Sequence, residues 1–207
     1  MAARILFVTG TDTGVGKTVC AAAIARTLRE HGVVVAALKP ICSGDRSDAR
    51  TLRAAAGCVL SLDEVNPWHF RAALAPKLAA RRENKRVRLR HAAAHVRRVA
   101  RRFQVVIVEG AGGLLSPLGE DFDSRDLIRS LGATPVVVCA NRLGAVNQVR
   151  LVLAALPRGL ARQARVILVE PTRPTAASRA NPKLLKEYLA AKRLYVTAWV
   201  RSRRRLR

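Results

Sequence analysis

The amino-acid sequence predicts an α/β fold with a doubly wound, mostly parallel sheet flanked by helices. Apolar, strand-like runs alternate with amphipathic helical patterns, which is typical of parallel strands joined by crossover helices. The strand-like runs are rich in Val, Ile and Leu without polar interruptions, as expected of strands that are covered on both faces. A length of 207 residues and a hydrophobic content of 50% suit one domain over residues 1–207.

The expected strands follow from these apolar runs. They are Arg4–Thr9, Val33–Leu38, Val105–Glu109, Pro135–Ala140, Arg165–Glu170 and Leu194–Trp199. The expected helices follow from helical periodicity in the segments between them. They are Lys17–His31, Ser47–Ala56, Arg88–Arg102, Ser124–Leu131, Val146–Leu156 and Pro182–Ala191. We interpret Gly32 as the C-cap of the first helix and Pro182 as a first-turn proline.

Three stretches lack a regular pattern, namely Lys39–Asp48, Asp63–Leu74 and Gly110–Asp123. In open α/β sheets, ligands bind at the carboxyl ends of the strands. Two of these stretches directly follow predicted strands, so we expect the functional site there. The basic tail Arg201–Arg207 is expected to be frayed.

The formal net charge of +24 raises nucleic acid as a partner. However, 31 of the 38 basic residues are arginines spread along the chain rather than gathered in one arm. Within His91–Phe103, apolar residues keep helical spacing on one side and arginines fall on the other, which is typical of a solvated helix face. Aromatic residues make up 4% of the chain, so stacking surfaces for single strands are scarce. We therefore expect no specific nucleic-acid partner.

The sequence contains no run of about 18 apolar residues and no leader-like segment at its N-terminus. Its four cysteines form no C-x-x-C pair, and Cys20 and Cys139 lie in apolar surroundings that favour small core residues. Unpaired thiols suit a reducing compartment. We therefore expect a cytoplasmic protein without a membrane partner.

Residues 10–18, with the sequence GTDTGVGKT, directly follow the first predicted strand and open the first helix. A glycine-rich turn lets backbone N–H groups converge on an anion at a helix N-terminus, where the helix dipole favours negative charge. In such a loop Lys17 reaches the β- and γ-phosphates, and the Thr18 hydroxyl ligates Mg²⁺. Thr11 occupies the position of the usual first glycine, and Gly10 lies one residue earlier. The segment predicts nucleotide chemistry.

Two strand ends carry further polar groups. The strand Val105–Glu109 ends in a carboxylate before a glycine-rich turn, Gly110–Gly113, which places Glu109 to hold Mg²⁺ directly or through water. Lys39 and Ser43 follow the second strand, where they are placed to hold an anionic substrate facing the γ-phosphate.

Further along, two acidic residues compete for one role. Asp48 lies at a predicted helix start, where it is either an N-terminal helix carboxylate or a second ligand for Mg²⁺. Asp45 is the alternative ligand, and the residues themselves leave the choice open. The turn Arg142–Asn147 again pairs a glycine with a helix N-terminus, which is the generic geometry of a second anion site.

Five segments taken together resemble the dethiobiotin synthetases. They are GTDTGVGKT at Gly10–Thr18, KPICSG at Lys39–Gly44, NPWHF at Asn66–Phe70, VEGAGG at Val108–Gly113 and LGAVN at Leu143–Asn147. Their order and spacing match that family over about residues 4–175. The resemblance implies a fold of the P-loop NTPase type and a homodimer. It also implies that the chain closes the ureido ring of dethiobiotin from 7,8-diaminononanoate, CO₂ and Mg-ATP, in the penultimate step of biotin synthesis.

The resemblance further implies the roles of individual residues. ATP is expected to bind Gly14, Val15, Gly16, Lys17, Thr18, Val19, Asp48, Glu109, Gly110, Ala111, Gly112, Glu170 and Pro171. Mg²⁺ is expected on Thr18, Asp48 and Glu109, a choice of Asp48 over Asp45 that rests on resemblance alone. Lys39 and Lys17 are the expected catalytic residues. The substrate is expected on Thr13, Ser43, Leu143, Gly144, Ala145, Val146 and Asn147, the last five receiving its carboxylate across the dimer interface.

Three features depart from the family pattern. The segment Asp45–Arg50 is shorter than in many relatives, and the C-terminal region is limited to Thr197–Arg207. Glu170 and Pro171 stand where the family often has Asn-Asp or Asn-Pro for the adenine base, so base selectivity stays open.

The main alternative is a partition-type, DNA-associated P-loop ATPase that would use the arginines on DNA. Such proteins usually carry an additional lysine early in the loop, and Thr11–Gly14 contains none. A second alternative is a related amide-forming synthetase. ATP turnover that depends on diaminononanoate, on DNA or on neither separates the three readings.

Overall fold

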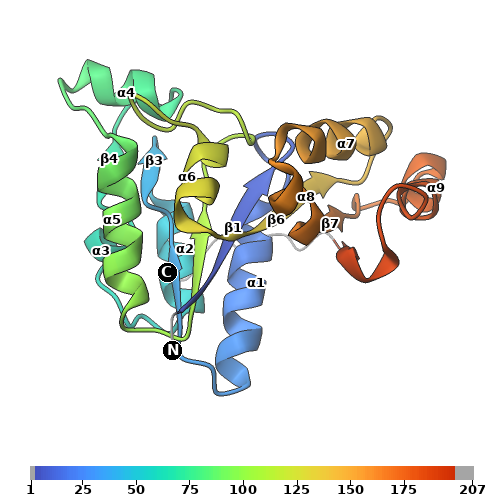
Figure 1. The fold of residues 1–207 in the computed structure, drawn as a ribbon, viewed down its shortest axis with the longest axis horizontal. Helices are drawn as coiled ribbons and strands as arrows, with labels where there is room; N and C mark the ends of the chain where they lie inside the picture. The colour runs from blue at the N-terminus through green and yellow to red at the C-terminus, as the bar shows by residue number, and fades with distance from the viewer. Residues whose placement is uncertain (1–2, 199–207) are drawn as a thin grey trace.

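The computed structural model describes residues 3–198, and its centre is a six-stranded sheet (Figure 1). The strands are β1 (Arg4–Gly10), β2 (Val35–Leu38), β5 (Val105–Glu109), β6 (Thr134–Ala140), β7 (Arg165–Val169) and β8 (Leu194–Thr197). They lie in the order β2-β5-β1-β6-β7-β8, and every neighbouring pair is parallel. The predicted fold class and its six strands are confirmed. Trp199, the predicted end of the last strand, and the tail Arg201–Arg207 lie outside the described residues.

Helices cover both faces of this sheet. They are α1 (Lys17–Glu30), α2 (Ser47–Ala55), α3 (Leu62–Val65), α4 (Pro76–Arg82), α5 (Leu89–Ala100), α6 (Ser124–Leu131), α7 (Ala145–Ala155), α8 (Arg158–Gln163) and α9 (Ala176–Leu185), with a short 3₁₀ helix, η1, at Ala191–Arg193. Helices α1 and α2 pack on the face that carries Val8 and Ile107. Helices α5 and α6 pack on the opposite face, against Phe7 and Val108, and α7 and α9 cover Val137. Among residues 3–198, none of the helices has the length and apolar character needed to cross a bilayer.

One of two helix signals in the sequence is borne out and the other is off by one residue. At the end of α1 the C-cap is His31 rather than the predicted Gly32. Gly32 is the next residue and has φ of 76°, the left-handed conformation that commonly follows a C-cap. In α5, Val96 and Val99 are buried whereas Arg97 and Arg98 are exposed. The arginines of this helix therefore lie on a solvated face, as predicted.

The chain also forms a second, two-stranded parallel sheet that the sequence did not predict. It pairs β3 (Ile41–Ser43) with β4 (Trp68–Phe70). Figure 1 shows this sheet with α4 and α5 at one end of the molecule, whereas α9 lies at the other end. Two of the three stretches predicted to be irregular therefore contain strands. Three residues are too few to show a periodicity, and only pairing between distant segments makes them strands.

The last predicted helix is wrong in position. Helix α9 begins at Ala176, after a capping box formed by Thr175 and Ser178, and Pro182 lies inside it rather than in its first turn. Proline has no N–H to bond the carbonyl four residues earlier, which is that of Ser178. Asn141 Nδ2 donates to this carbonyl at 2.8 Å. A tertiary hydrogen bond therefore makes the internal proline tolerable.

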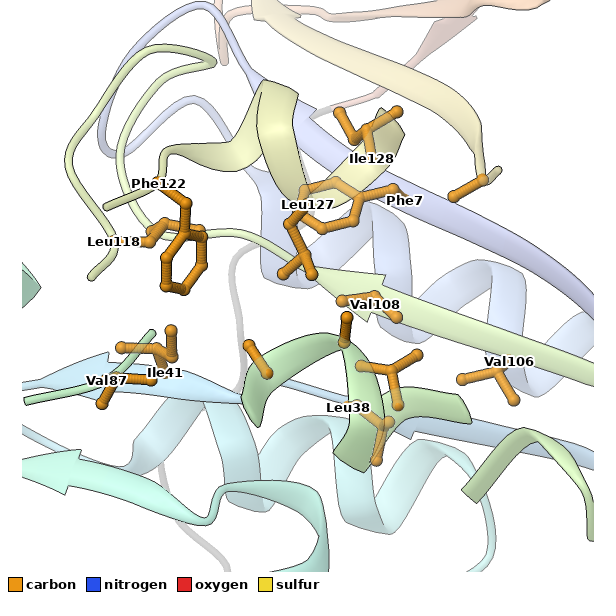
Figure 2. Packing of buried hydrophobic residues seen from close by; sticks show 14 of the residues in the cluster. Phe7, Leu38, Ile41, Val87, Val106, Val108, Leu118, Phe122, Leu127 and Ile128 are labelled. Atoms are coloured by element: carbon orange, nitrogen blue, oxygen red, sulfur yellow. The ribbon is translucent and has the colours of Figure 1, made fainter. Parts of the chain in front are cut away.

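The third predicted irregular stretch, Gly110–Asp123, contains no helix or strand, only an isolated bridge between Pro117 and Asp123. It is nevertheless anchored. Figure 2 shows Leu118 and Phe122 packed with the core residues around Ile41. The loop that follows Glu109 is therefore held by buried side chains.

Candidate active site

The glycine-rich loop connects the central strand β1 to α1. Gly14 and Gly16 have φ of 73° and 97°, and Gly16 is the N-cap residue of α1, with no side chain capping the helix. The first N–H groups of α1 therefore face the loop, which is the arrangement that binds anions. Thr11 does not have a positive φ, so this position does not require a glycine. Its N–H donates to Val138 O at 2.9 Å. A side chain at Gly10, by contrast, would lie 2.8 Å from Val15 Cγ2, so the glycine is required one position earlier than usual.

Lys17 begins α1 and points back over the loop. Its ammonium group donates to Asp12 O at 2.7 Å, and the residue is 6% exposed. Burial lowers the pKa of Lys17, and the nearby Glu109 carboxylate opposes that shift. The side chain is thus folded over the loop, in the position from which the sequence expects it to contact phosphate.

Lys39 is paired with both of the predicted carboxylates. Its Nζ lies 2.5 Å from Asp48 Oδ2 and 2.6 Å from Glu109 Oε1. The Thr18 hydroxyl donates to the same Glu109 oxygen at 2.9 Å. Residues from β1–α1, β2, α2 and β5 therefore converge at the carboxyl edge of the sheet, as predicted. Asp45, the alternative to Asp48, is bonded to Ser47 N–H instead and is exposed.

Charge and burial set the pKa directions in this cluster. Burial works against the charged form of Lys39, but the Glu109 and Asp48 carboxylates overcome it and raise the Lys39 pKa. Burial also works against the Asp48 carboxylate, and here the Lys39 ammonium prevails and lowers the Asp48 pKa. For Glu109, which is 1% exposed, burial dominates and raises the pKa in spite of Lys39.

The side-chain oxygens of Thr18, Asp48 and Glu109 are of the kind that Mg²⁺ prefers as ligands. Glu109 Oε2 is buried and has no hydrogen-bond partner among the described residues. Asp48 contributes a second carboxylate whose side chain is 42% exposed, and Thr18 contributes a hydroxyl. Over residues 3–198, no cluster of three or more His, Cys, Asp or Glu side chains is placed to hold a metal. Mg²⁺ is usually held by one or two carboxylates together with phosphates and water, and this site offers the carboxylates of Asp48 and Glu109.

A cavity of about 710 Å³ unites these groups. Twelve of the predicted site residues line it: Thr13, Gly14, Gly16, Lys17, Thr18, Val19, Lys39, Ser43, Asp48, Glu109, Ala111 and Gly112. The phosphate loop, the lysine and the carboxylates therefore share one space, large enough for small-molecule ligands.

Other predicted site residues lie outside the cavity lining. The side chain of Val15 is buried in the core beneath the loop. Gly110 packs so closely that an added Cβ would lie 2.7 Å from Ser124 Oγ. Glu170 follows β7 and accepts a hydrogen bond from Asn141 Nδ2 at 2.9 Å, and Pro171 comes next. Their roles toward a nucleotide stay predictions.

The segment expected to receive the substrate carboxylate is also outside the cavity. Leu143 is 87% exposed. Gly144 caps α7 with φ of 88°, and Ala145, Val146 and Asn147 form the first turn of that helix. A role in this chain's own cavity is therefore not apparent, and the predicted role across a dimer interface stays a prediction.

Asp45, the alternative to Asp48 in the sequence, also lines the cavity. Further lining residues were not predicted. They are Cys42, Ser47, Thr51, Ala73, Leu74, Ala75, Pro76, Ser116 and Pro117. Ser47 and Thr51 were detectable, because a spacing of four residues places them on one helix face near Asp48. The wall from Ala73 to Pro76 had no such signal, since only the β3–β4 pairing brings it over the site.

These features define a class. A parallel sheet with a glycine-rich phosphate loop between its central strand and the next helix is a nucleotide-binding fold of the P-loop type. A family profile described as "AAA domain" matches residues 4–199. The chain is also similar to curated relatives named ATP-dependent dethiobiotin synthetase BioD. The relative from Anaeromyxobacter sp. strain K is 45% identical over 163 residues, which is 76% of this chain and 73% of the relative.

Similar relatives occur in distant organisms. The one from Bacillus licheniformis is 38% identical over 197 residues, covering 92% of this chain and 84% of the relative. The one from Akkermansia muciniphila is 40% identical over 158 residues, covering 76% and 74%. The chain therefore belongs to the family of ATP-dependent dethiobiotin synthetases.

Solved structures resemble the chain in fold. The signal recognition particle receptor FtsY from Elizabethkingia anophelis matches with a TM-score of 0.57 and 13% identity, covering 97% of this chain and 60% of that one. The same receptor in complex with GDP matches with a TM-score of 0.59 and 14% identity, covering 97% and 58%. At this identity the likeness concerns the fold alone.

Proposed function

We propose that this chain is an ATP-dependent dethiobiotin synthetase that closes the ureido ring of 7,8-diaminononanoate with CO₂, releasing ADP and phosphate. Membership of the family supports this activity. The observation that carries the proposal is that one cavity is lined both by the phosphate loop and by Lys39 and Ser43. A nucleotide and a second, anionic reactant can therefore meet in one cavity.

The chemistry needs no covalent enzyme nucleophile. An amine of the substrate attacks CO₂ and loses a proton, giving a carbamate. A carbamate oxygen attacks the γ-phosphorus of ATP, so that ADP leaves and a carbamic-phosphoric anhydride forms. The second amine then attacks the carbonyl carbon, which closes the ring and expels phosphate. Catalysis consists of holding the reactants in line and stabilising developing negative charge.

The residues of this chain supply those two contributions. Lys17, folded over the loop, is placed to hold the β- and γ-phosphates, together with the N–H groups at the start of α1. Lys39 is charged because of its carboxylate neighbours, and it is placed to attract the carbamate. Thr18, Asp48 and Glu109 would hold Mg²⁺, which when bound neutralises phosphate charge.

We include a homodimer in the proposal. The support is two exposed apolar side chains, since Leu143 just before α7 is 87% exposed and Leu151 within α7 is 61% exposed. Exposed apolar side chains that gather into one patch favour a protein–protein contact. A partner at this surface would give Leu143–Asn147 the role across the interface that the sequence predicts. The cytoplasmic location belongs to the same proposal.

The decisive experiment is a reaction with defined components. Purified protein is incubated with 7,8-diaminononanoate, bicarbonate and Mg-ATP, and dethiobiotin is measured by mass spectrometry alongside ADP. We expect dethiobiotin and ADP in equal amounts, with neither formed when the diamine is omitted. Complementation of a biotin auxotroph lacking this step provides the matching test in cells.

Two parallel reactions separate the alternatives. ATP hydrolysis stimulated by double-stranded DNA, without dethiobiotin formation, would favour the partition-type ATPase. ATP turnover that responds to neither DNA nor the diamine would leave another synthetase substrate as the explanation. Dimerisation is measured by light scattering, with Leu143→Asp as the variant expected to dissociate.

A further inference from the structure

One buried amide side chain holds both ends of the segment between Lys39 and Asp48. Asn66 Nδ2 donates to Lys39 O at 2.7 Å and to Pro40 O at 3.4 Å, and Asn66 Oδ1 accepts from Arg46 Nε at 3.1 Å. The Asn66 residue is 1% exposed. A single side chain therefore links the residue that bears the ammonium group to the residue just before α2.

Arg46 strengthens this link. Its Nη2 donates to Asn66 O at 2.9 Å, to Leu62 O at 3.2 Å and to Asp63 Oδ1 at 2.8 Å. A planar guanidinium with several bonds is held in both position and orientation. Arg46 is also the N-cap residue of α2, and Asp48 is the second residue of that helix. The position of Arg46 therefore fixes the start of α2, and with it the position of the Asp48 carboxylate.

The turn that contains Asn66 is itself fixed. Lys39 N–H donates to Val65 O at 3.0 Å, and Asn66 N–H donates to Leu62 O at 2.9 Å. His95 Nε2 of α5 lies 2.8 Å from Glu64 O, and the His95 ring meets the Trp68 ring edge-on at 5.7 Å. The turn is thus anchored to α5, a helix that packs on the main sheet.

We propose that Asn66 and Arg46 are positioning residues, which hold the Lys39 ammonium and the Asp48 carboxylate at the separation that the reaction needs. The proposal rests on the proposed function. Neither residue is among those that line the cavity, so both act through Lys39 and Asp48. Displacement of a reacting group by about 1 Å can slow an enzyme about 10²-fold, which makes such a link catalytically important.

Two variants test the link from opposite sides. Asn66→Asp keeps the size and the acceptor for Arg46, but it replaces the donor that bonds the Lys39 and Pro40 carbonyls with an acceptor that repels them. Arg46→Lys keeps the positive charge but loses the planar fork. The matched control is Asp63→Asn, which removes only the ion pair to a side chain that is 86% exposed.

We expect the two variants to lower kcat/KM for the diamine without a comparable change in the Kd for ATP. For 7,8-diaminononanoate, kcat/KM falls about 10²-fold in Asn66→Asp and about tenfold in Arg46→Lys. The Kd for ATP measured without Mg²⁺ stays within about twofold, because neither residue contacts the phosphate loop and Asp48 meets the nucleotide through the metal. Asp63→Asn leaves both quantities unchanged. The thermal unfolding of each variant is also measured. If Asn66→Asp does not fold, the result for Arg46→Lys decides the proposal.

A second readout does not depend on activity. Cys42 lies within the linked segment, its Sγ is 3.1 Å from Asp45 O, and the residue is 3% exposed. In a Cys58→Ser background, which removes the exposed thiol, we expect Asn66→Asp and Arg46→Lys to raise the labelling rate of Cys42 severalfold.

The outcomes are distinct. Folded variants with wild-type kcat/KM and wild-type Cys42 labelling would overturn the positioning role. A parallel loss of affinity for ATP without Mg²⁺ would overturn it as well, because a general loosening of the fold would then explain the effect. If the wild-type chain forms no dethiobiotin, the proposed function fails, whereas the labelling rates still decide whether Asn66 and Arg46 hold the segment.

Discussion

The Lys39 ammonium lies 2.6 Å from the Glu109 carboxylate, and both side chains are buried. The sheet itself brings them together. Strands β2 and β5 are neighbours, and their register places Leu38 beside Val108. Lys39 directly follows β2 and Glu109 is the last residue of β5, so the parallel pairing brings two opposite charges together at the carboxyl edge. This pair is the basis of the first two predictions.

Removal of Lys39 should destabilise the fold. Lys39→Met would leave Glu109 buried without its closest counter-ion, and breaking a buried pair in this way costs about 3–5 kcal/mol. The double variant Lys39→Met/Glu109→Gln removes both charges and should recover most of that loss. Denaturant unfolding measures the free energies. Equal stability of the single and double variants would show that the pair is not coupled.

Substitution of Lys39 and substitution of Lys17 should affect different steps. Lys39→Ala is expected to lower turnover strongly and leave ATP binding largely intact. Lys17→Ala should raise the Kd for ATP about 10- to 100-fold, because a charged hydrogen bond is worth about 1.5–3 kcal/mol. Equilibrium nucleotide binding and steady-state turnover are measured on both variants. Mild and equal effects would mean that the site is misplaced.

Magnesium dependence should respond to the Thr18 hydroxyl. In Thr18→Val the oxygen that lies 2.9 Å from Glu109 Oε1 is lost, so we expect a higher Mg²⁺ concentration to be needed for half-maximal turnover. Thr18→Ser keeps the hydroxyl and should stay close to wild type. A titration with Mg²⁺ at saturating ATP distinguishes the two variants. The prediction fails if Thr18→Val and Thr18→Ser need the same Mg²⁺ concentration for half-maximal turnover.

Two glycines of the phosphate loop should differ in their tolerance of a side chain. Gly14 has φ of 73° with open space around it, so Gly14→Ala should cost only the backbone strain of about 1–2 kcal/mol. Gly16 has φ of 97°, and its added Cβ would also lie 3.3 Å from Val169 Cγ2. Gly16→Ala should therefore lose more stability in chemical unfolding and more affinity in ATP titration. The reverse order would contradict this loop geometry.

Stability should depend on pH through His95. Burial lowers the pKa of His95, and Arg98 donates to Nδ1 at 2.9 Å, so both burial and this hydrogen bond favour the neutral ring in the folded state. Between the folded pKa and the ordinary value of 6.5, the unfolded chain binds more protons, so stability rises with pH across that window.

The matched variant is His95→Gln, which keeps a donor for Glu64 O without a titrating ring. Its free energy of unfolding should change less between pH 5.5 and 7.5 than that of the wild type, on a scale of about 1.4 kcal/mol for each unit of lowered pKa. Identical pH slopes in the two proteins would rule out this contribution.

The sequence by itself determined the central sheet, most of the helices that cover it and the chemical character of the site. Strands such as Val105–Glu109 are long apolar runs, and α6 has both a capping signal and a clear amphipathic pattern. The phosphate loop is local, since a glycine turn and a helix N-terminus lie next to each other in the chain. Local signals of this kind need no knowledge of distant contacts.

Only the tertiary structure decided the remainder. The three-residue strands β3 and β4 exist because segments far apart in the chain pair with each other. Pro182 lies within a helix because Asn141 bonds the carbonyl that proline leaves free. The ion pairs of Lys39 and the link through Asn66 likewise join residues distant in sequence. Such contacts depend on strand order and register, which periodicity along the chain does not contain.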